Sequence, residues 1–381
     1  MGSENYSSTM RNINNFKHQI QVFGIVFLIS VIATYGPVDY AIAQSGESKT
    51  ANSKALAEDE TQRTVAFITL RNKTGNSKAT EYFGDDRDIR RAGHCLLSRT
   101  PLKALQTIAE NAPFYIPNDI VDLDKIEERS MEDFWRELEQ TRGARRPVLY
   151  THGYFIDFER GCKRASIFRA SQGLTGRFVL FSWPSDGAIL NYTGDESDLY
   201  WSVAPLAQTL TDMVEHFGAG GFDVTAHSLG TRGVFLALVQ MTGTEQVTKP
   251  LINELVLIAA DIDIGIFKQY LPRIRPLARN ITIYVSANDT PLAISRQVHG
   301  YPRLGETGAH LDGLTGVDII DLSGIPVRSP SGHVYHLYND IVANDLFQLL
   351  DSGKPASQRS NLKQTGENYW LLQSEPANDG G

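Results

Sequence analysis

Short, continuously apolar segments that alternate with helical patterns constrain the fold of this chain more than any other feature. A strand that is apolar at every position must be covered on both faces, so these segments predict a parallel sheet between two layers of helices. The expected strands are 64–71, 93–99, 147–152, 178–183, 222–227, 255–260, 281–286 and 317–322, and the expected helices are 131–141, 158–170, 198–217 and 231–240. Ligands of such sheets bind at the carboxyl ends of the strands, and the candidate functional residues of this chain fall there.

Ser228 stands between an expected strand and an expected helix, in the sequence Ala-His-Ser-Leu-Gly. The small residues Ala226 and Gly230, two positions to either side, permit a sharp turn that projects a serine hydroxyl. The N–H of Leu229 opens the following helix, where it can stabilise an oxyanion. We therefore predict that Ser228 is a nucleophile, the alternative being a serine that only caps a strand–helix turn. His227 is expected to pack rather than to act as a base.

A second group of candidates, His152-Gly153-Tyr154, lies at the end of the expected strand 147–152. Gly153 allows the backbone to approach a substrate, and the N–H of Tyr154 is the second predicted oxyanion donor. His152 is expected to hold this loop rather than to act as a base.

A nucleophilic serine needs a histidine to accept its proton and a carboxylate to orient that histidine. Asp289, which follows the expected strand 281–286, is the predicted carboxylate because of its place in the chain order. Asp261 is the alternative acid, with Asp263 beside it, after the preceding strand. Each of these residues can instead serve as the N-cap of a helix.

The predicted base is His333, which follows Gly332 in the loop after the last expected strand. His336, three residues further on, is the alternative base. His299 and His310 precede that strand and fit the chain order less well.

Together these motifs resemble the α/β hydrolases and, within them, the family catalogued as domain of unknown function 900. The segments that carry the resemblance are 151–154, 181–185, 226–230, 284–289, the Gly332-His333 loop and Tyr369-Trp370, with Ala226 in place of the glycine of the general hydrolase motif. The resemblance implies an α/β-hydrolase fold with a mostly parallel central sheet and helices on both faces. It also implies a triad of Ser228, Asp289 and His333, but no particular substrate.

The first 43 residues read as a signal peptide. The apolar run 20–35 has no charge, Arg11 and Lys17 precede it, and Ala41-Ile42-Ala43 follows it. This pattern predicts cleavage after Ala43 and an exported, periplasmic or secreted protein. The alternative is an uncleaved membrane anchor, in which case the chain contacts the membrane. We further expect a flexible linker at 44–63, the hydrolase domain at 64–351, and a mostly polar tail at 352–381 in which 369–372 docks onto the body.

The composition of the chain limits the classes of partner and cofactor that we expect. Lys and Arg number 36 against 44 Asp and Glu, which gives a net charge of −8 and argues against a nucleic-acid partner. Cys95 and Cys162 can pair in an oxidising compartment, but we favour two buried thiols that pack as small hydrophobes. The sequence contains no evident dinucleotide loop, phosphate loop or metal-ligand cluster, so no cofactor and no metal are expected. The oligomeric state is left open.

The substrate prediction rests on the segments around the site. Only a short segment separates the strands 255–260 and 281–286, so we expect no large cap domain there. Segment 184–200 is a possible lid, and its acidic residues suit a lipid surface poorly. We therefore expect hydrolysis of small or medium, soluble acyl esters, with Trp183 either lining the acyl pocket or packing in the core. The alternatives are a catalytically silent, hydrolase-like binding scaffold in the cell envelope, or a peptidase or thioesterase that uses the same triad.

Overall fold

The computed structural model describes residues 64–101, 119–141, 145–174, 177–188, 191–243, 249–327, 329 and 331–374. The predicted signal peptide, its cleavage site after Ala43 and the linker 44–63 lie outside these residues. Within the described ranges, no helix combines the length and the apolar character needed to span a membrane.

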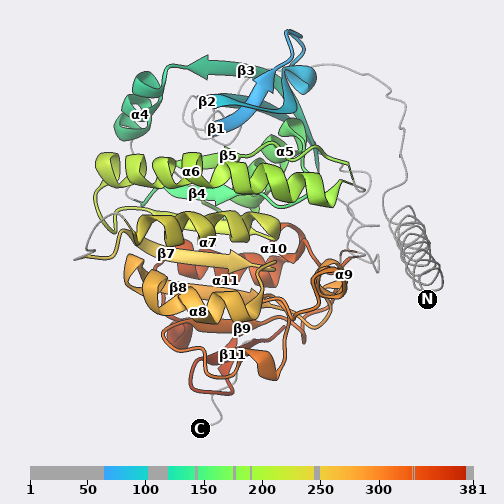
Figure 1. Cartoon of the computed structure of the whole chain (residues 1–381), viewed down its shortest axis with the longest axis vertical. Coiled ribbons are helices and arrows are strands. Elements are labelled where there is room, and N and C mark those ends of the chain that lie inside the picture. The colour runs from blue at the N-terminus through green and yellow to red at the C-terminus, as the bar shows by residue number, and fades with distance from the viewer. Residues whose placement is uncertain are drawn as a thin grey trace, which may run out of the picture. The chain divides into compact units, whose positions relative to one another are not determined.

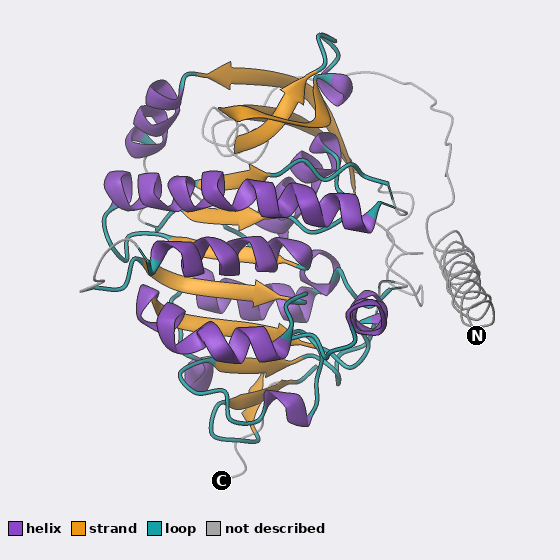
Figure 2. Cartoon of the chain, in the orientation of Figure 1, coloured by secondary structure: helices purple, strands orange, loops and turns teal. Residues whose placement is uncertain are grey.

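Eleven strands of the described residues form one sheet, in the order β10-β11-β9-β8-β7-β6-β4-β5-β1-β2-β3 (Figures 1 and 2). From β11 to β1 all neighbours pair in parallel, whereas β2, β3 and β10 add antiparallel edges. The bounds are β1 (Thr64–Lys73), β2 (Phe83–Pro101), β3 (Asp119–Arg129), β4 (Val148–Thr151), β5 (Phe178–Ser182), β6 (Asp223–His227), β7 (Ile252–Ile258), β8 (Ala278–Val285), β9 (Asp318–Asp321), β10 (Leu362–Gln364) and β11 (Tyr369–Leu372).

Helices cover both faces of this sheet (Figure 2). In the view of Figure 1, α6 (Tyr192–Phe217), α7 (Leu229–Met241) and α8 (Ile264–Ile274) lie in front, and α5 (Phe158–Ser171), α10 (Tyr335–Tyr338) and α11 (Asp340–Leu350) lie behind. Strand β4 shows why its segment is apolar throughout: Leu149 joins the core on one face, while Val148 and Tyr150 join the core on the other. The predicted mostly parallel α/β fold is confirmed.

Several elements differ from the expectation. Helix α6 begins at Tyr192, six residues before the expected start, so it takes up most of the segment read as a lid. The short strand expected at 93–99 is part of the much longer β2, whose second half (92–101) pairs with β3, a strand that was not predicted. Residues 369–372 are strand β11, which pairs in parallel with β9, so the sheet continues well past Asp351.

The prediction of two free thiols is wrong. Cys95 on β2 and Cys162 on α5 form a disulfide, and neither residue is exposed. Their Cα atoms lie 6.2 Å apart because α5 packs across β2, a long-range contact that brings together two distant parts of the chain.

Candidate active site

Ser228 lies on a strained turn between β6 and α7. Its backbone has φ 53° and ψ −128°, in a region that a side chain rarely adopts. The N–H of Ser228 donates to the carbonyl of Ile258 at 2.9 Å. A Cβ at Gly230 would lie 2.2 Å from the carbonyl oxygen of His152, so only glycine lets the start of α7 approach the end of β4. The sequence therefore places a serine at a sharp turn beside the loop that follows β4.

Asp289 and His333, which are distant in the sequence, are hydrogen-bonded. Nδ1 of His333 lies 2.8 Å from Oδ2 and 2.9 Å from Oδ1 of Asp289, and because an ionised carboxylate only accepts, Nδ1 carries the proton. Asp289 also caps α9 (Thr290–His299), accepting from the N–H of Leu292 at 3.0 Å. One carboxylate thus serves both roles that the sequence left open for it, orienting a histidine and capping a helix.

The loops that carry this pair are tightly packed together. Gly332 has φ +65°, and a Cβ there would lie 2.0 Å from the carbonyl oxygen of Asn288. His227, the residue before Ser228, donates from Nε2 to the carbonyl of His333 at 3.1 Å, and the two rings lie 4.6 Å apart. The serine turn and the histidine loop are therefore in direct contact. His227 packs between them, as expected, and burial lowers its pKa well below the ordinary value, which keeps the ring neutral.

Asp261, the alternative acid, belongs to a different network. It accepts from Nε of Arg303 at 2.7 Å, pairs with Arg232 at 3.3 Å, and accepts from the hydroxyls of Tyr192 and Ser295. Burial raises the pKa of Asp261, but the two guanidinium groups and the hydroxyls outweigh burial and lower the pKa to about 2.

His336, the alternative base, is fully buried behind His227, with ring centroids 4.2 Å apart. Its Nε2 lies 3.4 Å from the hydroxyl of Tyr150. Burial lowers the pKa of His336 well below its usual value, so the ring stays neutral. The structure brings Asp289 to His333 and holds the two alternatives in other surroundings.

The loop after β4 lies directly against the serine. A Cβ at Gly153 would lie 2.7 Å from Cβ of Ser228, which makes glycine necessary here. The next residue is Tyr154, the predicted oxyanion donor. Leu229, the other predicted donor, is the first residue of α7, and N–H groups of a first helical turn have no acceptor within the helix. Both backbone donors therefore belong to segments that flank Ser228.

Trp183 does not line an open pocket. Its ring is fully buried, stacks on His152 at a centroid distance of 5.2 Å, and donates from Nε1 to the His152 carbonyl at 2.9 Å. His152 holds the loop as expected, because its Nδ1 lies 2.8 Å from the carbonyl of Gly153. Burial, with a smaller contribution from Arg71, lowers the pKa of His152 to about 3, so it is neutral. Of the two roles left open for Trp183, the structure shows core packing.

The model of the family described as alpha/beta hydrolase of unknown function (DUF900) matches residues 126–350. The chain belongs to this family. The match bears out the resemblance seen in the motifs. A search of curated proteins gives no match.

Two solved structures share a low similarity with the chain. One is a predicted CIB-like hydrolase from Thermoplasma acidophilum, with 13% identity and a TM-score of 0.32, covering 55% of this chain and 89% of that chain. The other is the product of gene lin2722 from Listeria innocua, with 13% identity and a TM-score of 0.26, covering 60% of this chain and 99% of that chain.

Two acidic residues of segment 184–200, Asp195 and Glu196, are held by partners outside helix α6. Asp195 has no exposed surface, and Glu196 pairs with Arg232 and with His299, whose Nε2 lies 2.9 Å away. The hydrogen bond to Glu196 raises the pKa of His299 above its usual value. Two carboxylates of the segment expected as a possible lid are therefore bound by groups on other segments of the chain.

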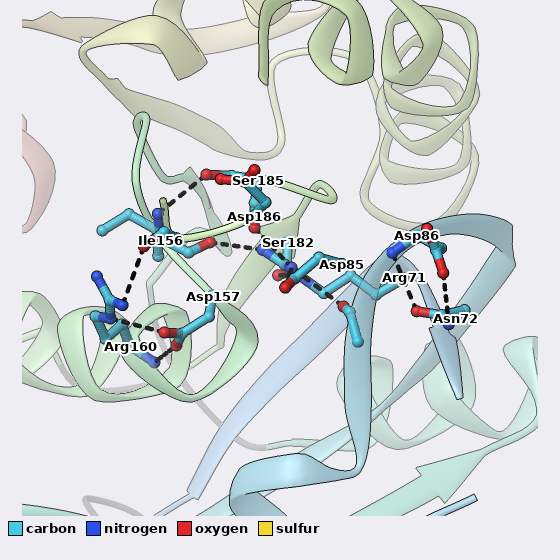
Figure 3. A network of polar contacts seen from close by, with 12 residues as sticks. Arg71, Asn72, Asp85, Asp86, Ile156, Asp157, Arg160, Ser182, Ser185 and Asp186 are labelled. Carbon is cyan, nitrogen blue, oxygen red and sulfur yellow. Dashed lines mark hydrogen bonds and ion pairs between the residues drawn. The ribbon is translucent and has the colours of Figure 1, made fainter. Parts of the chain in front are cut away.

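Sequence reasoning also missed Arg71, at the end of β1. Its side chain is fully buried, although an arginine is among the residues least often found inside a protein. It reaches the loops that follow β4 and β5 (Figure 3). A charged residue inside an otherwise apolar strand was the available signal, but it does not reveal which loops the side chain holds.

Proposed function

We propose that this family member is a serine hydrolase that cleaves acyl esters of small or medium, soluble substrates through an acyl-enzyme. One observation carries the proposal: the hydrogen bond from Nδ1 of His333 to Asp289, on a loop that packs against the strained turn of Ser228. A serine, a histidine that accepts its proton and a carboxylate that orients this histidine are the parts that nucleophilic acyl transfer requires.

The proposed mechanism gives each group one role. Asp289 holds His333 with the proton on Nδ1, so Nε2 accepts the proton of the Ser228 hydroxyl as its oxygen attacks the ester carbonyl. The N–H groups of Tyr154 and Leu229 stabilise the negative oxygen of the tetrahedral intermediate. The intermediate expels the alcohol, which takes the proton from His333. A water molecule, deprotonated by His333, then attacks the acyl-enzyme. As the bond from the acyl carbon to the Ser228 oxygen breaks, His333 returns the proton to that oxygen, so the acid and free Ser228 are released.

Charged side chains near the serine support a soluble substrate. Arg232 lies one helical turn after Ser228 on α7, and Glu196 and His299, both partly exposed, complete a charged group beside it. An apolar lipid surface is bound by contiguous apolar patches, and a charged group such as this one suits a soluble substrate better.

The test uses a fluorophosphonate, a reagent that reacts with activated serines, with intact-mass and peptide mass spectrometry and Ser228→Ala as the control. We expect one adduct, on Ser228, and none in the control. A folded wild-type protein that forms no adduct contradicts the proposal and favours a silent binding scaffold. For a labelled protein, a series of esters from short soluble to long-chain emulsified tests the substrate class, because preference for the emulsions contradicts it. Parallel thioester and peptide substrates test the alternatives.

We also propose that the protein is exported. The Cys95–Cys162 disulfide supports this, because disulfides persist in oxidising compartments and are rare in the cytosol. Mass spectrometry of the protein recovered outside the cytoplasm tests the cleavage: the mature N-terminus is expected at Gln44. A peptide that spans Ala43 and Gln44 in the exported protein contradicts cleavage and supports a retained anchor.

A further inference from the structure

The first turn of α6 holds one carboxylate, Asp195, that is bound entirely by groups from two other loops. Its Oδ2 accepts from the N–H of Phe155 at 3.2 Å and from the hydroxyl of Ser185, and its Oδ1 accepts from the N–H of Asp186 at 3.0 Å. Asp195 has no exposed surface. All three donors face a carboxylate that only accepts, so the ionised form satisfies every one of them.

Arg71 donates hydrogen bonds to carbonyl groups of the same two loops, those after β4 and β5. Its Nη2 donates to the carbonyl of Ile156 at 2.6 Å and its Nη1 to the carbonyl of Ser185 at 2.9 Å. Figure 3 shows the two loops joined as well by the Ser185 hydroxyl, which accepts from the N–H of Ile156 at 3.0 Å. Arg71 thus binds carbonyl groups, and Asp195 binds N–H groups, of the same two loops, the one after β4 and the one after β5.

Burying two opposite charges at this place is costly unless both are hydrogen-bonded, and it is weak evidence for stability alone. The loop that they fix is the one that follows β4 and carries the proposed oxyanion donor. Phe155 in this loop has φ +63°, a strained conformation for a bulky residue that persists only where its surroundings enforce it. Strain of this kind, enforced beside a reacting group, is typical of a preorganised site.

We propose that Asp195 is a positioning residue that sets the oxyanion loop. By accepting from the Phe155 N–H, its carboxylate fixes the peptide between Tyr154 and Phe155, and thereby the direction of the Tyr154 N–H relative to Ser228. Ser185 relays the same restraint to Ile156. The inference rests on the proposed function, because the loop is a catalytic element only if Ser228 is the nucleophile.

The decisive variant is Asp195→Asn, which keeps the shape of the side chain. It replaces one of the two carboxylate oxygens with an NH2 group, which then faces a hydrogen-bond donor instead of accepting from it. We expect kcat on a short soluble ester to fall about ten- to hundredfold with KM within about twofold, less than the loss of an oxyanion donor itself. The matched control is Asp198→Asn, one turn later on α6. Asp198 pairs with Arg87 at 2.6 Å, and its described contacts include neither loop. We therefore expect the kcat and KM of Asp198→Asn to stay at wild-type values.

Hydrogen exchange of residues 150–157 gives a readout that needs no turnover. Asp195→Asn is expected to speed exchange in this segment, and Asp198→Asn to leave it unchanged. Ser185→Ala, a milder change, is expected to act in the same direction, and its effect combined with Asp195→Asn should be smaller than the product of the two single effects because both act through one loop. If Asp195→Asn does not fold, Ser185→Ala alone tests the claim through the same two readouts.

The outcomes separate this inference from the proposed function. If the wild-type protein labels at Ser228 but Asp195→Asn and Ser185→Ala leave kcat and loop exchange unchanged, the proposed role of Asp195 is wrong and the proposed function is unaffected. A fall in kcat accompanied by an equal fall at Asp198→Asn also overturns it, because α6 then acts as a whole. A wild-type protein that does not label overturns the proposed function, and the catalytic role of the loop with it.

Discussion

Asp261 and Asp289 follow neighbouring parallel strands, β7 and β8, and both are buried at the same edge of the sheet. Asp289 meets a histidine, whereas Asp261 meets Arg232 and Arg303. An imidazole can accept and release a proton, which suits proton transfer, whereas a guanidinium keeps its proton and forms a permanent ion pair. The comparison teaches that its position in the fold makes a carboxylate a candidate for the catalytic acid, whereas the side chain with which it pairs decides whether it can act as one.

The largest expected effect is that of Asp289→Asn on catalysis. The amide oxygen can still cap α9 at Leu292, so the melting temperature should change little. Orientation of His333 is lost, so kcat should fall about 10³- to 10⁴-fold, as when the acid of a serine triad is replaced by asparagine. Steady-state kinetics on a short ester, beside a thermal melt, measures both. Wild-type kcat in a folded variant would remove Asp289 from the triad.

Asp261→Asn should produce the opposite pattern. It leaves Arg303, only 2% exposed, and Arg232 without their full partner, so the free energy of unfolding should drop by about 3–5 kcal/mol. The kcat should change much less than in Asp289→Asn, because the described contacts of Asp261 do not include His333. Urea unfolding and ester kinetics on both variants test the contrast. If Asp261→Asn is stable but inactive, the two assignments must be exchanged.

The same comparison shows what sequence could predict here. The turn of Ser228 was predictable because the small residues Ala226 and Gly230 mark a local steric demand. Asp289 was separable from Asp261 only by chain order, since both follow a strand and both can cap a helix. The arginine partners that decide the matter come from α7 and from the segment after α9, far along the chain from Asp261, and no local pattern encodes such contacts.

The same limit explains what was missed. The burial of Asp195 was not predictable, because it depends on the loops after β4 and β5. The Cys95–Cys162 pair depends on how α5 crosses β2. By contrast, the apolar tetrapeptide that forms β11 stood out in the polar tail and predicted docking onto the body. Its pairing with β9 could not be predicted from the sequence.

A pH titration of stability sharpens the contrast by isolating Asp261. Its pKa is about 2 in the folded protein against 3.8 ordinarily, so folding is favoured by the ionised form. That stabilisation is complete above about pH 4 and is lost as the pH falls toward 2, and a shift of this size corresponds to about 2 kcal/mol. The difference in unfolding free energy between wild type and Asp261→Asn should therefore shrink by about that amount from pH 5 to pH 2. A constant difference over this range contradicts the role of the two arginines.

The smallest expected effect lies at the rim of the Asp261 network, where His299 contacts both Ser295 and Glu196. The hydrogen bond to Glu196 raises the pKa of His299, so the charged ring favours the folded state. The stabilisation is full below the ordinary histidine pKa, about 6.5, and is lost as the pH rises through the higher folded value. Because the pair is partly exposed, it contributes less than about 1 kcal/mol.

The comparison of wild type with His299→Gln should therefore show a small stability difference at pH 5.5 that diminishes by pH 8.5, measured by urea unfolding. His310→Gln is the matched control, because Nε2 of His310 contacts the carbonyl of Glu306 rather than a carboxylate. A difference that grows with pH, or that appears equally in the control, contradicts a charged His299–Glu196 pair. A difference confined to His299 and to low pH shows that the network around Asp261 ends in a titrating pair, whereas its centre, held by two arginines, does not titrate near neutral pH.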